Sequence, residues 1–316
     1  MWKIIFQQLN QIIMEILYIA IGVLKMLAKD SLNKYIEKAQ SNKQNDIQFN
    51  DILVDMSNCE IILRHFNSRY PDMNSHPTIM NVNDFIKNIK DSPPNNNERK
   101  LFIVNAGGDR THFATANVFK DMNDKISIIF VDSSLGRNQH ILFALYLNFK
   151  DASNIKTLYI YNQIQNSNGD CLLFSLHFLK KMHKHRNHFV KLHQDLFNDR
   201  IRFIREKNTT FNPPEELSDD YLEKAHVVFF DQAIKLLPID FFKHAHSKTP
   251  INAYLENHPD ETSKKVNKWK GGETLIDRYN RHKVIRTIDG KQRTYSSSIE
   301  EKRLSLAQAA LRWLGE

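Results

Sequence analysis

The stretch TLYIYNQIQNSNGDCLLFSLHFLKKM, residues 157–182, carries three structural signals in succession. Residues 157–164 alternate between apolar and polar side chains, which is typical of a strand. The polar NSNGD segment then predicts a tight loop, and an apolar and later basic helix begins at Cys171. The order strand, loop, helix indicates a fold that mixes both element types.

The sequence upstream of this stretch supports the same fold class. Three short apolar runs, separated by turn-forming residues, predict a three-stranded meander, and three further segments have helical spacing. We therefore expect an α+β (α/β) fold, a mixed sheet flanked by helices. The expected strands are 101–105, 112–119 and 126–131, and the expected helices are 50–67, 82–89 and 138–149.

The helical and strand-like spacing of apolar residues becomes weaker after residue 206. Residues 208–220, NTTFNPPEELSDD, predict an exposed connector, and three shorter segments follow it at 230–247, 251–259 and 298–314. The last of these is an amphipathic helix. We predict three parts: an apolar, amphipathic N-terminal segment (1–49), a catalytic core (50–205) and a C-terminal regulatory region (206–316).

The composition is that of a globular protein of 316 residues with 41% hydrophobic side chains. Two cysteines are too few for a disulfide framework, and no paired Cys/His spacing suggests a metal site, so a reducing compartment is expected. The net charge is +8 and the pI is near 9.2. This positive charge is compatible with binding to a nucleic acid, an anionic membrane or a polyanionic small molecule. The alternative is a basic surface without such a partner.

The first 28 residues are apolar on most helix faces. Only nine uncharged residues lie between Glu15 and Lys25, fewer than the ~20 that span a bilayer. Glu15 also interrupts the apolar core that a signal peptide needs. We expect an amphipathic helix that either packs on the body of the protein or lies on a membrane surface.

Cys171 is the candidate nucleophile. A thiol at a helix N-terminus lies near unpaired N–H donors and the positive end of the helix dipole, which favour the thiolate. A lone cysteine is more often a buried structural residue, so partners must support the assignment. His112 begins one expected strand and Asp132 ends the next, so strand pairing can join a base to an orienting carboxylate.

Gln165 lies six residues before Cys171. A side-chain amide there can donate to the oxyanion that forms when a thiolate attacks a carbonyl, beside the backbone N–H groups of the helix start. The alternative is a solvent-facing glutamine. The order His, Asp, Gln, Cys on these elements is more specific than any one member.

Five segments, in this order, resemble the YopJ family of bacterial effectors: RKLFIVNAGGDRTHFATANVF, KISIIFVDSS, IQNSNGDCLLFSLHFLKKM, LPIDFFKHAHS and VNKWKGGETLIDRY. The resemblance covers roughly residues 50 to 305. The order of His, Asp, Gln and Cys is also similar to that of the cysteine protease clan of the SUMO and adenovirus proteases. The resemblance implies a mixed sheet core of the ubiquitin-like-protease type, with a helical regulatory region built from N- and C-terminal segments.

The resemblance implies a ping-pong acetyltransferase that moves acetyl from acetyl-CoA through Cys171 to Ser, Thr or Lys of host signalling proteins such as kinases. It also implies activation by inositol hexakisphosphate and secretion from a bacterium into the host cell cytosol. The residues implied for inositol hexakisphosphate are Arg69, Lys243, His244, Arg278 and Arg281, with Lys268 behind them. Those implied for acetyl-CoA are Ser298, Lys302 and Arg303. For each cation the alternative is a solvated surface charge.

The chain departs from the family pattern at two positions. The family usually has glycine directly after the cysteine, where this chain has Leu172. Glutamate is common in the family at the position of Asp132. A leucine side chain at 172 can crowd the oxyanion region, which would reduce activity or alter the substrate set.

Two other functions compete with acetyl transfer. One is a cysteine protease that removes ubiquitin or a ubiquitin-like protein, and the other is a catalytically dead effector that binds a kinase. A nucleic-acid binder ranks below both, because the basic charge comes without an aromatic-basic motif. Residues 1–28 leave membrane contact open, and the sequence carries no signal for oligomers.

Overall fold

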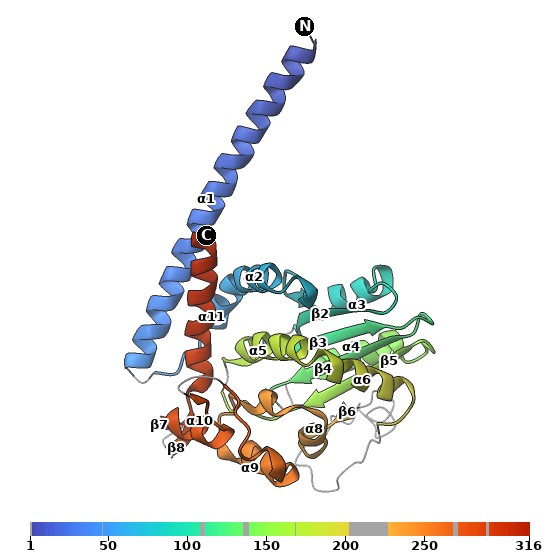
Figure 1. Cartoon of the computed structure of the whole chain (residues 1–316), viewed down its shortest axis with the longest axis vertical. Helices are drawn as coiled ribbons and strands as arrows, with labels where there is room; N and C mark the ends of the chain where they lie inside the picture. Colours follow the sequence, from blue (N-terminus) through green and yellow to red (C-terminus); the bar gives the residue numbers. More distant parts are fainter. Residues whose placement is uncertain are drawn as a thin grey trace.

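The computed structural model shows a six-stranded mixed sheet (Figure 1). It describes residues 2–45, 47–107, 111–134, 139–167, 169–201, 227–267, 271–288 and 291–316. The strands lie in sequence order, with β2, β3 and β4 antiparallel and the pairs β1–β2, β4–β5 and β5–β6 parallel. Their bounds are β1 Met80–Asn81, β2 Glu98–Asn105, β3 Phe113–Lys120, β4 Ile126–Asp132, β5 Ile155–Tyr161 and β6 Val227–Val228.

Helices cover both faces of this sheet, and the strand sequences show why. All seven residues of β4 are buried, with Ile129 and Val131 in one hydrophobic core and Ile128 and Phe130 in another. Successive side chains of a strand point to opposite faces, so a strand buried on both faces reads as one continuous apolar run. The expected α+β fold class is confirmed.

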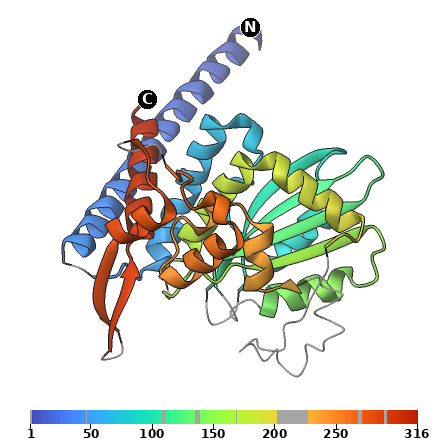
Figure 2. The ribbon, with the colours of Figure 1, turned by 60° about the horizontal axis from the view of Figure 1, so that its bottom comes forward.

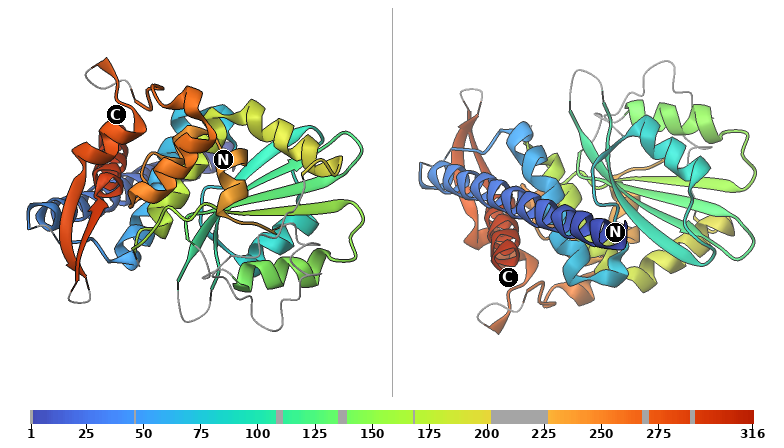
Figure 3. Two further views of the ribbon diagram at one scale, coloured as in Figure 1. Left: turned by 90° about the horizontal axis from the view of Figure 1, so that it is seen from below. Right: turned by 90° about the horizontal axis from the view of Figure 1, so that it is seen from above.

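Different helices supply the two cores (Figure 3). α5 (Cys171–Lys184) and α6 (Arg186–Phe197) pack on one face, together with α2 (Ile52–Arg69). α3 (Val82–Asp91) and α4 (Gln139–Phe149) pack on the other face. Polar residues fix two of the helix starts: Asp51 accepts a hydrogen bond from the Val54 N–H at 3.1 Å, and Asn81 accepts one from Asp84 at 2.9 Å.

The N-terminal helix α1 (Trp2–Gln44) lies within the predicted N-terminal segment and continues beyond residue 28. Its second half packs against α2 and α11 (Ser298–Gly315), where Leu32 and Tyr35 are buried. Its first half projects beyond the body of the molecule (Figure 1). Among the helices described here, none is long and apolar enough to cross a membrane.

The C-terminal region wraps one end of the sheet (Figure 2). The hairpin of β7 and β8, which the sequence analysis missed, precedes α11. The connector at 208–220 lies outside the described residues, and the division into three parts stays a prediction. The remaining elements are η1 Pro71–Met73, α8 Phe230–Leu236, η2 Ile239–Phe242, α9 Lys248–Asn257, η3 Pro259–Glu261, α10 Leu275–Arg281, β7 Lys283–Ile288 and β8 Lys291–Ser296.

Candidate active site and basic pocket

Cys171 is the first residue of α5, directly after the N-cap residue Asp170. The Asp170 side chain does not cap the helix, so the N–H groups of the first turn stay oriented toward the loop in front of it. Cys171 is 1% exposed. A thiol at this place lies in the field of the helix dipole, which stabilises a thiolate.

Strand pairing brings His112 and Asp132 together. In the antiparallel pair of β3 and β4, Thr115 lies opposite Val131, so His112, just before β3, comes close to Asp132 at the end of β4. The His112 Nε2 atom lies 2.9 Å from Asp132 Oδ1. The Tyr159 hydroxyl donates to Asp132 Oδ2 at 2.8 Å and the Ser134 N–H donates to Oδ1 at 2.9 Å, so the carboxylate is fixed on both oxygens.

The electrostatics of this pair favour a protonated imidazole. Burial by itself lowers the pKa of His112, but the charge and hydrogen bond of Asp132, with a further hydrogen bond to Cys171, raise it to about 10. Because Nε2 faces Asp132, Nδ1 is the ring nitrogen left for the thiol. His112 can therefore hold a positive charge at neutral pH.

Gln165 lies at the entrance to the same loop and is nearly buried. Its Oε1 accepts a hydrogen bond from the Ser133 hydroxyl at 2.6 Å, and its Nε2 donates to the Ser167 carbonyl at 2.8 Å. These contacts tie the loop before Cys171 to the end of β4. One of its two amide N–H groups is thus already used within the protein.

Leu172 is fully buried in the main hydrophobic core, together with Leu173 and Phe174. Its side chain is therefore part of the packing beneath α5. This placement argues against the expected crowding of the oxyanion region by Leu172.

A buried ion network supports the loop before Cys171. Arg303, from α11, donates to Asp170 at 2.7 Å and to both oxygens of Asp55, at 3.0 and 3.1 Å. Arg303 is 0% exposed and lies 4.2 Å from the centre of the Phe49 ring. Burial alone would raise the pKa of Asp170, but the Arg303 charge keeps it below its usual value. The carboxylates occupy the Nε and Nη2 atoms of Arg303, while its Nη1 atom has no hydrogen-bond partner among the described residues.

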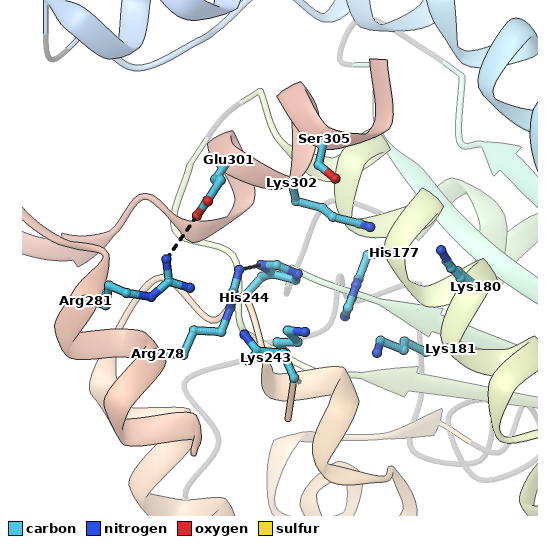
Figure 4. A pocket seen from close by; sticks show the side chains of 11 residues that line it. His177, Lys180, Lys181, Lys243, His244, Arg278, Arg281, Glu301, Lys302 and Ser305 are labelled. Carbon is cyan, nitrogen blue, oxygen red and sulfur yellow. Dashed lines mark hydrogen bonds and ion pairs between the residues drawn. The ribbon is translucent and has the colours of Figure 1, made fainter. Parts of the chain in front are cut away.

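A basic pocket of about 340 Å³ lies beside the later turns of α5 (Figure 4). Its walls come from α5, α10, α11 and the segment that follows η2. Figure 4 shows the basic side chains converging on one space, with Arg281 paired to Glu301. The lining residues are His177, Lys180, Lys181, Lys243, His244, Asn267, Arg278, Arg281, Glu301, Lys302 and Ser305.

Crowding of like charges marks this pocket. Burial, followed by the repulsion of neighbouring cations, lowers the pKa of both Lys243 and Lys302 to about 7. Burial and nearby Lys181 also hold the pKa of His177 well below its usual value. An anion in this pocket would favour the charged state of both lysines.

The structure gathers only some of the ligand residues that the resemblance implies. Lys243, His244, Arg278 and Arg281 line the pocket, as does Lys302, which the resemblance implies for acetyl-CoA. Arg69 lines a different groove, and Lys268 lies outside the described residues. Ser298 is buried, with its hydroxyl 2.6 Å from His244 Nδ1.

Sequence reasoning missed the three residues that α5 contributes. His177, Lys180 and Lys181 have i, i+3 and i+4 spacing, which places them on one face of the helix that begins at Cys171. That spacing was the available signal. Within the described ranges, no group of three or more His, Cys, Asp or Glu side chains is placed to hold a metal ion.

Comparisons with known proteins agree on one family. The serine/threonine-protein acetyltransferase YopJ of Yersinia pestis is 28% identical over 247 residues, which cover 76% of this chain and 75% of the relative. YopJ of Yersinia pseudotuberculosis is 27% identical over the same length.

Two solved structures share the fold. AvrA delL154 with IP6 and CoA has a TM-score of 0.72 at 23% identity, covering 90% of this chain and 98% of its own. HopZ1a in complex with IP6 has a TM-score of 0.70 at 20% identity, covering 92% and 98%. The family model of the YopJ serine/threonine acetyltransferases matches residues 32–309, so the chain belongs to this family.

Proposed function

We propose that the protein transfers acetyl from acetyl-CoA, through Cys171, to Ser, Thr or Lys side chains of host signalling proteins such as kinases. The observation that carries the proposal is the contact of His112 with Asp132, beside a cysteine at a helix N-terminus. In line with the family, we also propose secretion from a bacterium and action in the host cell cytosol.

The chemistry needs two transfers at one sulfur. The Cys171 thiolate attacks the thioester carbonyl, the bond to the coenzyme sulfur breaks, and the coenzyme leaves as a thiol with the proton of His112. The acceptor hydroxyl or amine then attacks the acetyl-cysteine, His112 takes its proton, and Cys171 returns as the thiolate. Asp132 orients the ring throughout.

The negative oxygen of each tetrahedral intermediate needs hydrogen-bond donors. The N–H groups of the first turn of α5, the helix that begins at Cys171, can serve as such donors. We include Gln165 through the amide N–H that it does not give to Ser167. Contact of Ser298, Lys302 and Arg303 with acetyl-CoA stays a prediction, and the buried ion pairs of Arg303 favour a structural role for it.

We further propose that the basic pocket binds inositol hexakisphosphate as an activator. The lining suits this ligand because it holds six lysine or arginine side chains and one acidic side chain, Glu301. Asp240 and Glu273, outside the lining, pair with Lys181 and Arg278. Phosphate groups would offset the repulsion that lowers the pKa of Lys243 and Lys302. α5 carries Cys171 at its first residue and pocket cations about 13 Å further along its axis, so ligand binding can stabilise the helix that holds the nucleophile.

The direct test of acetyl transfer uses labelled acetyl-CoA. We expect label on the wild-type protein that withstands denaturation and is absent from Cys171→Ala. Inositol hexakisphosphate should increase the labelling. Label that stays on Cys171→Ala at the wild-type rate would contradict the assignment of the nucleophile, and cleavage of a ubiquitin-like substrate without labelling would favour a protease.

The pocket is tested separately by thermal unfolding. At a ligand concentration of about 100 Kd, inositol hexakisphosphate should stabilise the wild type by about 2.7 kcal/mol. The double variant Lys243→Gln/Lys302→Gln should lose most of this gain. Lys264→Gln, an exposed lysine outside the pocket, is the matched control and should keep it. A wild type with unchanged melting temperature in low salt would overturn the pocket assignment.

A further inference from the structure

The projecting half of α1 exposes an apolar surface that neither the catalytic site nor the basic pocket uses. Ten large apolar side chains between residues 13 and 27 are each 45–65% exposed. They are Ile13, Met14, Ile16, Leu17, Ile19, Ile21, Val23, Leu24, Met26 and Leu27. So much exposed apolar surface in one segment marks an interaction site.

The distribution of these side chains indicates what can cover them. At 3.6 residues per turn, the ten positions extend around roughly two-thirds of the helix circumference. A second helix would bury one stripe of such a surface and leave the rest in water. A lipid phase can cover a wide apolar face, while the polar side chains of Lys25 and Lys29 stay at the surface.

Cations surround the base of this segment, where α1 meets the body. A groove of about 550 Å³ lies between α1, α2 and α11, with Ile21, Leu24 and Ile61 among its apolar walls and Lys25 and Arg64 among its polar ones. It therefore continues the apolar surface of α1 down to a charged rim.

A second groove shares Ser68, Trp313 and Glu316 with the first and adds Arg69 and Arg312. Lys25, Arg64, Arg69 and Arg312 are all exposed, and the two grooves contain one acidic side chain, that of Glu316. We call these four cations the basic collar. Trp313 is half-buried beside them, and tryptophan favours the boundary between lipid and water.

We propose that residues 13–27 dock into the surface of an anionic phospholipid bilayer, with the basic collar against the lipid headgroups. Apolar burial supplies the insertion, and the collar selects a negatively charged surface. This proposal does not depend on acetyl transfer. It would hold the active site close to acceptor proteins at a membrane.

Flotation of the full chain with lipid vesicles tests the proposal. We expect binding to phosphatidylcholine vesicles with about 30% phosphatidylserine, and weaker binding to phosphatidylcholine alone. The triple variant Ile16→Gln/Ile19→Gln/Val23→Gln should bind about tenfold more weakly or worse. Leu53→Gln, at a side chain 71% exposed on α2, is the matched control and should bind like the wild type.

A second triple variant separates charge from apolar burial. Lys25→Gln/Arg64→Gln/Arg312→Gln should weaken binding to the phosphatidylserine vesicles about tenfold and bring it near the level for neutral vesicles. Circular dichroism should show unchanged helix content in both triple variants, since all six side chains are solvent-exposed.

Three outcomes would overturn the proposal. One is failure of the wild type to bind the phosphatidylserine vesicles, and another is wild-type binding by the apolar triple variant. The third is a concentration-dependent dimer that the apolar triple variant loses, measured by light scattering without lipid, because it would assign this surface to a second copy of the chain.

Discussion

The two ends of α5 differ in how completely their buried charges are paired. At its first turn, opposite charges are paired: His112 with Asp132, and Asp170 with Arg303. At its later turns, Lys181 is paired with Asp240 at 2.7 Å, but Lys243 and Lys302 lie among several cations and their pKa values fall to about 7. The first arrangement is complete within the chain, while the second leaves a charge excess that a ligand can neutralise. A site whose charges are balanced is suited to position reacting atoms, and an unbalanced one is suited to sense a polyanion.

The largest effect should come from removing a charge at the first turn of α5, where opposite charges are paired. Asp132→Asn keeps the shape of the side chain but removes the charge that raises the pKa of His112. We expect the rate of acetyl transfer to fall about 10³- to 10⁴-fold, as for an orienting carboxylate in other triads.

Initial rates with labelled acetyl-CoA would measure this effect. Tyr159→Phe is the comparison variant, since it removes only one hydrogen bond to Asp132 and should cost far less. Asp132→Asn with a rate near that of the wild type would show that the carboxylate is not needed for orientation.

A smaller effect is expected from Arg303→Met, which leaves Asp55 and Asp170 buried without their cation. Loss of one partner from a buried network costs about 3–5 kcal/mol, so the melting temperature should fall by roughly 10 °C. Calorimetry would measure it. The triple variant Arg303→Met/Asp55→Asn/Asp170→Asn removes the uncompensated charges as well and should recover part of the loss. No recovery would indicate that packing of Arg303 on Phe49 matters more than its charge.

The smallest effect, and the sharpest contrast between the two ends, is in the pH dependence of stability. The folded pKa of His112 is raised from 6.5 to about 10, so its contribution to stability is complete below pH 6.5 and is lost as the pH rises toward 10. The folded pKa of Lys243 and Lys302 is depressed from 10.5 to about 7, so unfolding takes up protons and stability rises between these values.

Unfolding in urea across pH 6–10 would separate these two trends. The stability difference between the wild type and Asp132→Asn should shrink with rising pH, because that variant lacks the charge that raises the pKa of His112. The unliganded wild type should be less stable than Lys243→Gln/Lys302→Gln at low pH, and this stability deficit should also become smaller as the pH rises. Parallel curves for the wild type and a variant would contradict the pKa shift at that end.

Local patterns predicted four of the six strands of the sheet and the contact of His112 with Asp132. Apolar runs such as ISIIFVD carry their own signal, and Asp132 and His112 each lie at a strand end, so antiparallel pairing was enough to join them. The two-residue strands β1 and β6 escaped notice because two residues show no periodicity. The β7–β8 hairpin was missed since its charged strand sequences resemble a loop.

The basic pocket could be predicted only in part, because it depends on tertiary contacts. Lys243 and Arg278 were named from the family resemblance, whereas Lys180 and Lys181 read as the polar end of a helix. The resemblance implied that Arg303 binds acetyl-CoA, whereas in the structure it pairs with Asp55 and Asp170. These two residues lie 248 and 133 positions away in the chain. No local pattern reveals such partners.

The separation of Asp55, Asp170 and Arg303 along the chain has a consequence for biosynthesis. A chain leaves the ribosome N-terminus first, so both carboxylates emerge well before the arginine that neutralises them. Until α11 has been made, the loop before Cys171 lacks its main ionic support. The loop that holds Cys171 therefore gains this ionic support only after α11 has left the ribosome.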